Sequence, residues 1–158
     1  FIISEANRYD IKGRKYIGSN SKYYYTDIGL RNAKLNFRQY EPTHIMENII
    51  YNHLNMLGYN IDVGIVEVNE KKGSSYQKKQ LEVDFIVNKG DVKFYIQSAY
   101  RMESEEKKNQ EKSSLQKIND SFKKIIVIND SFKSRYDENG FLLISLKDFL
   151  LEKGEGEL

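Results

Sequence analysis

The sequence contains no cysteine, no tryptophan and only two histidines among its 158 residues. Without cysteine, the chain has no disulfide, no thiolate catalysis and no cysteine-ligated zinc or iron–sulfur site. The two histidines, His44 and His53, argue against a histidine-based zinc cluster. Because tryptophan is absent, the 12 tyrosines and 8 phenylalanines must supply the large rings of the core.

Long apolar segments are also missing. No apolar run approaches the roughly 20 residues of a membrane span, and no signal-peptide pattern opens the chain. We therefore expect a cytoplasmic protein with no membrane partner. The formal net charge of +2, with 30% of residues charged, neither requires nor excludes nucleic acid, because a local patch matters more than the sum.

The length allows one domain with its own core. The chain begins at Phe1, within an apolar segment and without methionine, so we expect a piece of a longer protein. Residues 1–21 are polar and basic, which predicts a linker, an incoming strand or the end of an upstream unit. We expect an α/β domain at residues 22–153 and a tail at residues 154–158.

The spacing of apolar residues predicts the elements of this domain. One helix follows Pro42, with Thr43 as the expected N-cap and Gly58 as the C-cap. The polar segment 70–80 predicts an exposed loop. The remaining expected elements are helices at 102–120 and 146–153, a short extended stretch at 22–30, and strands at 59–68, 81–87, 92–100, 124–129 and 141–145. This order predicts an α/β fold with a mixed central β-sheet flanked by helices.

Three acidic residues form a candidate metal site. Glu82 and Asp84 are two apart on one expected strand and so share a face, whereas Val83 and Phe85 face the core. Glu47, on the helix expected beside this strand, can join them. Such oxygen ligands suit Mg²⁺ or Mn²⁺, and a metal held there could activate water and polarise a phosphate. The alternative is that Glu47 is ion-paired or on the solvent side of its helix, and that Glu82 and Asp84 are exposed strand residues.

Four stretches carry a family resemblance: residues 22–32, 46–51, 82–85 and 95–97. Together they resemble the PD-(D/E)XK, or restriction-endonuclease-like, fold over roughly residues 8–152. More narrowly, the chain is similar to the uncharacterised C-terminal domain that follows the ATP-binding module in a family of prokaryotic AAA-type ATPases. The resemblance implies an upstream ATPase domain as partner, with ATP bound only there. It also implies a winged helix between the two, to which residues 1–15 would contribute the last strand.

By the same resemblance, Glu47 matches the helical acid of the nuclease site, and Asp84 matches the central metal-binding acid. The third motif is degenerate, because Gln97 stands in the place of its acid and Ala99 in the place of its catalytic lysine. Gln97 brings no negative charge, and Ala99 cannot stabilise charge on a reacting phosphate. Arg101, two positions after Ala99, is the candidate replacement for the lysine.

Several basic residues are candidates for nucleic-acid contacts: Lys71, Lys72, Lys78, Lys79 and Arg101. They could hold phosphates from a flexible segment, although a run of charge is more often a solvated surface.

Three hypotheses for function follow from these features. The first is a catalytically degraded binding or regulatory module, which presents nucleic acid or a protein partner to an attached ATPase. The second is an active Mg²⁺- or Mn²⁺-dependent DNA nuclease with a rearranged third motif. The third is a docking or dimerisation domain that binds no nucleic acid. The lost acid and lysine of the third motif favour the first.

Overall fold

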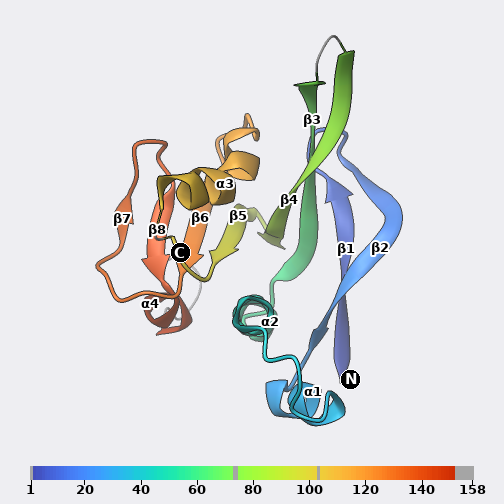
Figure 1. Cartoon of the computed structure of the whole chain (residues 1–158), viewed down its shortest axis with the longest axis vertical. Coiled ribbons are helices and arrows are strands. Elements are labelled where there is room, and N and C mark those ends of the chain that lie inside the picture. The colour runs from blue at the N-terminus through green and yellow to red at the C-terminus, as the bar shows by residue number, and fades with distance from the viewer. Residues whose placement is uncertain (1, 73–74, 103, 152–158) are drawn as a thin grey trace.

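The computed structural model describes residues 2–72, 75–102 and 104–151, and these residues form one eight-stranded sheet (Figure 1). The strand order is β2-β1-β3-β4-β5-β6-β8-β7. Three neighbouring pairs are parallel, β1–β3, β5–β6 and β6–β8, and the others are antiparallel. The strands are β1 (Ile3–Asp10), β2 (Lys15–Tyr25), β3 (Asn60–Lys72), β4 (Ser75–Lys89), β5 (Val92–Ala99), β6 (Lys123–Ile128), β7 (Arg135–Tyr136) and β8 (Leu142–Ser145).

Helices cover both faces of this sheet. On one face, α2 (Pro42–Met56) and α4 (Leu146–Leu151) bury Ile50, Leu54 and Phe149 against the strands. On the other face, α3 (Glu105–Gln116) buries Leu115. A fourth helix, α1 (Ile28–Lys34), follows β2. The predicted α/β fold with a mixed central sheet is therefore confirmed, and it is consistent with a restriction-endonuclease-like architecture.

Of the two predicted ends of α2, the C-terminal cap is correct and the N-terminal cap is wrong. Gly58 follows the helix with a φ of 80°, the left-handed conformation that glycine adopts readily, as predicted for the C-terminal cap. The N-cap is Glu41 rather than Thr43, because the helix already begins at Pro42. Proline suits the first helical position, where its missing N–H has no partner to lose.

Within residues 2–21, most of the chain forms β1 and the first part of β2, as the strand alternative predicted, rather than a linker. Strand β1 lies between β2 and β3, and it pairs with both of them. The expected domain boundary at residue 22 falls inside β2. Polar composition misled the prediction here, because strands near the edge of a sheet keep many of their side chains in solvent. Whether an upstream winged helix exists stays a prediction, and the expected tail at 154–158 lies outside the described residues.

The polar segment 70–80, expected to be an exposed hairpin loop, does lie in a hairpin, but its described residues continue the two strands instead of forming a loop. Strands β3 and β4 stay paired as far as Lys72 and Ser75, and their hairpin projects beyond the rest of the sheet (Figure 1). The segment is therefore a long two-stranded arm with polar residues on both faces.

A β-bulge in β4 changes which side chains face α2. The register of β3 with β4 shifts between the pairs Asp62–Ile86 and Gly64–Val83, so β4 has one extra residue there. Val83 packs on the α3 face, whereas Phe85 packs on the α2 face. The prediction that these two side chains share a face is wrong for this reason.

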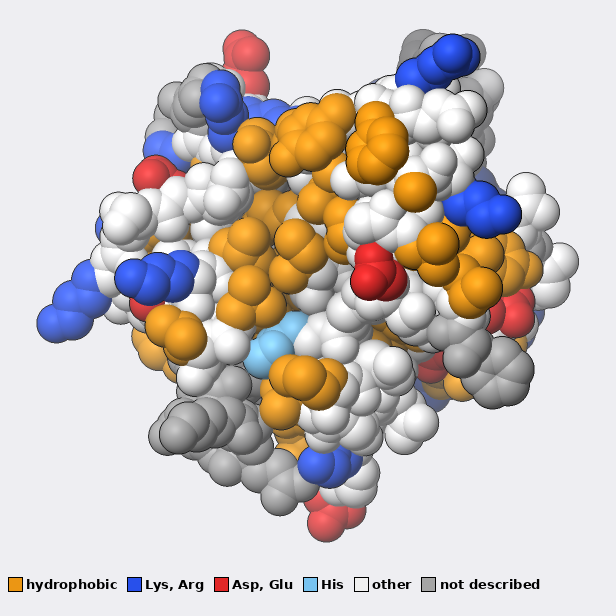
Figure 2. Space-filling view, turned by 90° about the horizontal axis from the view of Figure 1, so that it is seen from below, with side chains coloured by type: hydrophobic (Ala, Val, Ile, Leu, Met, Phe, Trp, Pro, Cys, Tyr) orange, Lys and Arg blue, Asp and Glu red, His pale blue; other side chains and the backbone are white. Residues whose placement is uncertain are grey.

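The lower surface of the molecule is apolar in part. Figure 2 shows hydrophobic side chains gathered across this face, where α1, α2 and α4 lie. Among the residues from these helices and the segment after α1, Phe37, Met56 and Leu151 are strongly exposed. No helix within the described ranges is long and apolar enough to cross a membrane.

Candidate functional site

The predicted acidic residues meet around a lysine. The Lys22 Nζ atom lies 2.8 Å from Glu47 Oε1, 2.7 Å from Glu82 Oε1 and 3.8 Å from Asp84 Oδ1. We call these four residues the Lys22 cluster. Strand β2 supplies the lysine, α2 supplies Glu47, and β4 supplies the other two acids. The predicted convergence of the three acids is present, but a cation of the chain itself lies at its centre.

Strand β2 is held against α2 by side-chain hydrogen bonds to its backbone. The Tyr25 N–H donates to Asn48 Oδ1 at 2.9 Å, and Asn48 Nδ2 donates to the Tyr25 carbonyl at 2.7 Å. Asn52 adds a second bond to the same carbonyl at 2.9 Å. Because Asn48 is one residue after Glu47 on the helix, this contact fixes Lys22 and Glu47 relative to each other.

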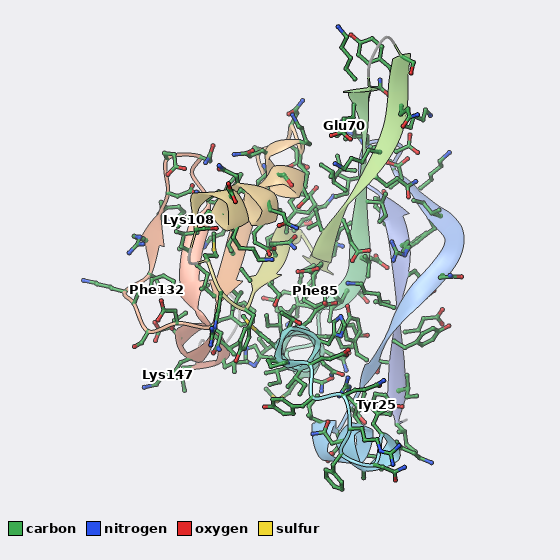
Figure 3. The ribbon with its side chains drawn as sticks, in the orientation of Figure 1. Tyr25, Glu70, Phe85, Lys108, Phe132 and Lys147 are labelled. Atoms are coloured by element: carbon green, nitrogen blue, oxygen red, sulfur yellow. The ribbon has the colours of Figure 1, made fainter. Side chains whose placement is uncertain are left out.

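Tyr24 completes the wall beside Glu47. Its hydroxyl donates to Glu47 Oε1 at 2.6 Å, and its ring stacks on Tyr51 with a centroid distance of 4.2 Å. Burial, and then the charge of Glu47, raise the pKa of Tyr24 above its usual value. The hydroxyl therefore stays protonated and acts as a donor. The ring also lies near Phe85, which Figure 3 shows beside α2.

Asp84 is the least solvated acid of the cluster. The Ser98 N–H donates to its Oδ2 atom at 2.7 Å, just past the Phe85–Ile96 pair where the β4–β5 ladder ends. Burial raises the pKa of Asp84 to about 8, and the charge of Glu47 acts in the same direction. Lys22 and the Ser98 N–H oppose this rise. The balance of these influences favours the protonated form of Asp84.

The cluster then balances its own charge. Burial opposes the charged form of Lys22, but the charge of Glu47 and the hydrogen bonds to Glu47 and Glu82 outweigh it, so the pKa of Lys22 lies above its usual value. Arg8 Nη1 contacts Glu82 Oε2 at 2.8 Å and brings a second positive charge. With Asp84 protonated, the formal charges of Lys22 and Arg8 match those of the two glutamates.

The two residues of the degenerate third motif point away from the cluster. Gln97 Oε1 accepts a hydrogen bond from Ser114 Oγ of α3 at 3.4 Å. Ala99 is completely buried in the core on the α3 face. Neither side chain supplies a ligand or a cation to the Lys22 cluster. The sequence placed Gln97 in the site because its position along β5 matches that of the acid in the third motif. Its side chain instead faces α3, where it accepts the hydrogen bond from Ser114.

The Lys22 cluster does not fit a resident metal ion. A metal bound by Glu47, Glu82 and Asp84 would occupy the space near the Lys22 amine and be repelled by its charge. Within the described part of the chain, no group of three or more histidine, aspartate or glutamate side chains is arranged to hold a metal. The donor chemistry of these three acids is suitable, and the lysine is what makes the site unsuitable.

The lysines predicted for nucleic-acid contacts lie on the projecting arm, far from the cluster. Figure 3 places Glu70 near the end of this arm, well away from Phe85. Lys78 pairs with Glu67 and Lys79 with Glu70, each at 3.3 Å. Lys71 is exposed, and the side chain of Lys72 lies outside the described part of the structure. Two of these lysines thus have acidic neighbours across the hairpin, which weakens the arm as a phosphate-binding surface.

Arg101 does not reach the Lys22 cluster either. Its guanidinium carbon lies 5.8 Å from the centre of the Tyr100 ring, and the residue lines a cavity on the α3 side of the sheet. The basic side chain that lies among the acids is that of Lys22, from β2. The signal that could have found this lysine is its place directly before three tyrosines, a residue type that favours strands.

Comparison with known proteins adds one relative. The chain is 30% identical over 152 residues to an uncharacterised protein of Haemophilus influenzae. The match covers 96% of this chain and 34% of that protein, so the chain spans about a third of the length of its relative. No family model matches the chain, and no solved structure matches it significantly.

Proposed function

We propose that this chain is a restriction-endonuclease-like module of a longer ATP-binding protein, and that it binds a partner without cleaving nucleic acid. The observation that carries the proposal is the position of the Lys22 amine among Glu47, Glu82 and Asp84. A metal-dependent nuclease needs acids that attract a divalent cation. Here a lysine supplies the positive charge permanently.

The third motif supports the same proposal. Phosphate cleavage in such a site requires charge stabilisation at the reacting phosphate. Gln97 is bonded to Ser114 and Ala99 is buried in the opposite core. A fold kept without this machinery is suited to holding nucleic acid or a protein partner for an attached activity.

A role within a longer protein is supported by the relative, about two thirds of which lies outside the match. We propose that the additional part contains the ATPase domain implied by the resemblance, that ATP binds there, and that the whole protein is cytoplasmic. On this proposal the present chain needs no Mg²⁺ or Mn²⁺ of its own.

Calorimetric titration of Mn²⁺ and Mg²⁺ tests the proposal. We expect no saturable binding to the wild type at neutral pH, because Lys22 and Arg8 already balance the charges of the two glutamates. Lys22→Met keeps much of the side-chain length and removes the charge, so we expect it to create one Mn²⁺ site. The double variant Lys22→Met with Asp84→Asn should lose that site again.

The opposite result would overturn the proposal. If wild-type protein binds Mn²⁺ at one site and Asp84→Ala abolishes that binding, the cluster is a metal site in spite of its lysine. Circular dichroism of each variant should accompany the titration, because freeing buried carboxylates also lowers stability.

That opposite result would favour a second candidate, an active nuclease. The specific observation behind it is that a lysine reaches the acids from β2 even though Ala99 cannot. This candidate predicts Mn²⁺-dependent cleavage of DNA by the wild type, and loss of cleavage in both Asp84→Ala and Lys22→Met. Equal cleavage by wild type and variants would identify a contaminating enzyme.

A further inference from the structure

The lower surface of the molecule carries an apolar stripe on α2 that the core does not use. The side of α2 that faces the sheet buries Ile50 and Leu54. Ile45, Ile49 and Met56 are spaced by four and seven residues, so they lie along another side of the same helix. Among the described residues, Ile45 and Ile49 are half-buried and pack with neither core cluster, and Met56 is 74% exposed. Helix α2 therefore presents a second apolar side toward solvent.

The solvent side of α2 also lacks charged side chains. Glu47 is the only aspartate, glutamate, lysine or arginine between Pro42 and Met56, and its side chain lies in the Lys22 cluster. In the whole chain, 30% of residues are charged. The central part of a protein–protein interface is depleted of charged residues, unlike an ordinary solvated surface. The composition of α2 therefore indicates a surface suited to contact with another protein.

Exposed apolar side chains extend the stripe at both of its ends. Shortly before α2 begins, the segment after α1 presents Phe37, which is 79% exposed. At the other end, α4 lies beside α2, since the rings of His53 and Phe149 are 5.5 Å apart, and α4 ends at the strongly exposed Leu151. Figure 2 shows hydrophobic side chains gathered across this side of the molecule. The α2 face is the name we give to Phe37, Ile45, Ile49, Met56 and Leu151.

The backbone holds Phe37 in solvent at an energetic cost. Asn36, Phe37 and Gln39 have φ values of 52°, 55° and 54°, in the left-handed region that residues other than glycine rarely adopt. The Phe37 N–H donates to the Asn32 carbonyl at 2.7 Å, which fixes this turn to the end of α1. Strained backbone of this kind clusters at functional positions, and here it projects an aromatic ring away from the core.

We propose that the α2 face is the contact of a symmetric dimer, in which the α2 helices of two copies of this chain pack antiparallel. Two-fold dimers of this type are the commonest protein oligomers. The face itself carries no charge that a second copy would repel. The antiparallel arrangement places Phe37 of each copy against Met56 of the other, and methionine sulfur packs favourably on aromatic rings. It also sets the two helix dipoles in opposite directions.

The area of the α2 face is sufficient for a weak dimer. Large apolar side chains present roughly 150–200 Å² each when exposed, so the face offers on the order of 500 Å² of apolar surface. Exposed polar residues around it, such as Arg38 and Lys147, add a rim. Together they approach the ~800 Å² that each partner of a standard interface buries. We therefore expect a dissociation constant in the micromolar range.

Sedimentation equilibrium of the intact chain measures this association. We expect monomer at about 1 µM, mostly dimer at about 200 µM, and no species larger than two copies. Phe37→Asp and Met56→Lys each place a charge in the contact, so each should weaken the dimer by about tenfold or more. In the double variant the two new charges meet across the antiparallel contact, so it should dimerise more tightly than either single variant.

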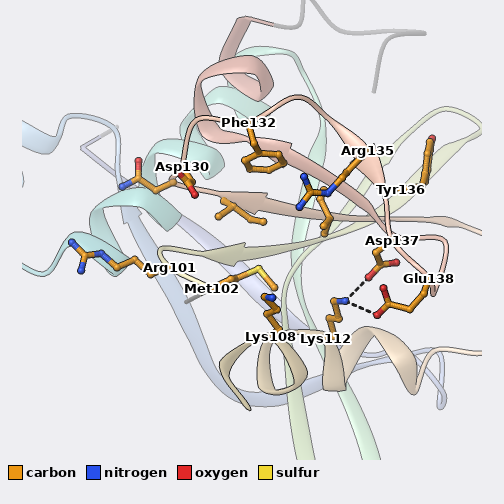
Figure 4. Close-up of a pocket in the computed structure, with 13 residues that line it drawn as sticks. Arg101, Met102, Lys108, Lys112, Asp130, Phe132, Arg135, Tyr136, Asp137 and Glu138 are labelled. Carbon is orange, nitrogen blue, oxygen red and sulfur yellow. Dashed lines mark hydrogen bonds and ion pairs between the residues drawn. The ribbon is translucent and has the colours of Figure 1, made fainter. Parts of the chain in front are cut away.

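Tyr136→Asp is the matched control. Tyr136 is a similarly exposed aromatic residue of β7, beside a cavity on the α3 side of the sheet. Unlike the α2 face, that cavity is lined by charged groups. Lys112 Nζ contacts Asp137 Oδ2 at 2.7 Å and Glu138 Oε1 at 3.0 Å, as the dashed lines in Figure 4 show. The control should dimerise as the wild type does.

Three outcomes would overturn the proposal. A chain that stays monomeric at every concentration leaves the α2 face to another part of the longer protein. A dimer of wild-type affinity in Phe37→Asp or Met56→Lys would place the contact elsewhere. A double variant as weak as the single variants would exclude the antiparallel arrangement. Both substituted side chains are exposed, and circular dichroism checks that the variants fold. Neither substitution touches the Lys22 cluster, so the dimer and the proposed function can fail separately.

Discussion

The pKa of Asp84 is set by its burial and by three neighbouring groups, which come from other elements of the fold. Glu47 disfavours its ionised form, whereas Lys22 and the Ser98 N–H favour it. Burial, the largest influence, tips the balance toward the protonated acid. The alternation along β4 predicted correctly that Asp84 and Glu82 would approach the same site. The alternation did not predict that Lys22 lies among these acids. A lysine on an edge strand is expected to face solvent unless the position of α2 is known.

The raised pKa makes a prediction for stability against pH. Between the unfolded pKa near 4 and the folded pKa of about 8, the folded state keeps a proton that the unfolded state has released. The contribution of Asp84 to stability therefore falls as pH rises through this window, by at most about 1.4 kcal/mol per pH unit. Asp84→Asn should remove this contribution to the pH dependence of the free energy of unfolding. The stability of the variant relative to the wild type should therefore be highest near pH 8. Urea unfolding at pH 5, 6, 7 and 8 measures it.

The difference between variant and wild type cancels the contributions of His53 and Asp62, whose pKa values are also shifted by burial. Asp91→Asn, at an exposed turn, serves as the control and should keep the wild-type slope. An Asp84→Asn protein with an unchanged slope would show that Asp84 is ionised in the folded state.

At the scale of elements, the contact between α2 and β2 decides the geometry of the site. The helix was predictable from its apolar spacing, and so was the strand run that contains Asp84. Their partner β2 was only partly foreseen, as an extended stretch after residue 22. Asn48 joins α2 to β2, since its side-chain amide hydrogen-bonds to both the N–H and the carbonyl of Tyr25. A buried asparagine on an apolar helix gives no indication in sequence of which strand it will meet.

Asn48→Ala should therefore lower the free energy of unfolding by about 2–3 kcal/mol, because two hydrogen bonds are lost and a buried N–H loses its acceptor. Urea denaturation measures the loss, and hydrogen exchange at the Tyr25 amide should accelerate. Asn55→Ala, on the exposed side of the same helix, should change stability by much less. Equal losses in the two variants would mean that helix propensity, and not the β2 contact, is responsible.

At the scale of the whole molecule, the β1–β2 hairpin extends the sheet, and its strand β2 places Lys22 beside the acids of β4. Strand β1 fills the space between β2 and β3 and buries Ala6 completely. The parallel pairing of β1 with β3 joins segments that are far apart in sequence. Such pairing depends on the rest of the sheet being formed, so local patterns could not reveal it.

A chain that begins at residue 22 tests this role. Removing β1 and most of β2 exposes the edge of β3 and leaves the tyrosines of residues 23–25 without a strand partner. We expect the shortened protein to lose cooperative unfolding or to aggregate, as measured by thermal circular dichroism and size-exclusion chromatography. Unfolding at the wild-type temperature would instead support the original expectation that the first 21 residues are a linker.

The sequence by itself determined the α/β class, a helix after Pro42, most of the strands, and the shared strand face of Glu82 and Asp84. These depend on local periodicity, which records which side of an element faces the core. The tertiary structure alone decided that Lys22 lies among those acids, that the bulge turns Phe85 toward α2, and that Gln97 bonds to α3. The physical reason is that these outcomes depend on distances between separate elements. The burial of a side chain and the charges around it are set by the neighbours that folding brings close to it.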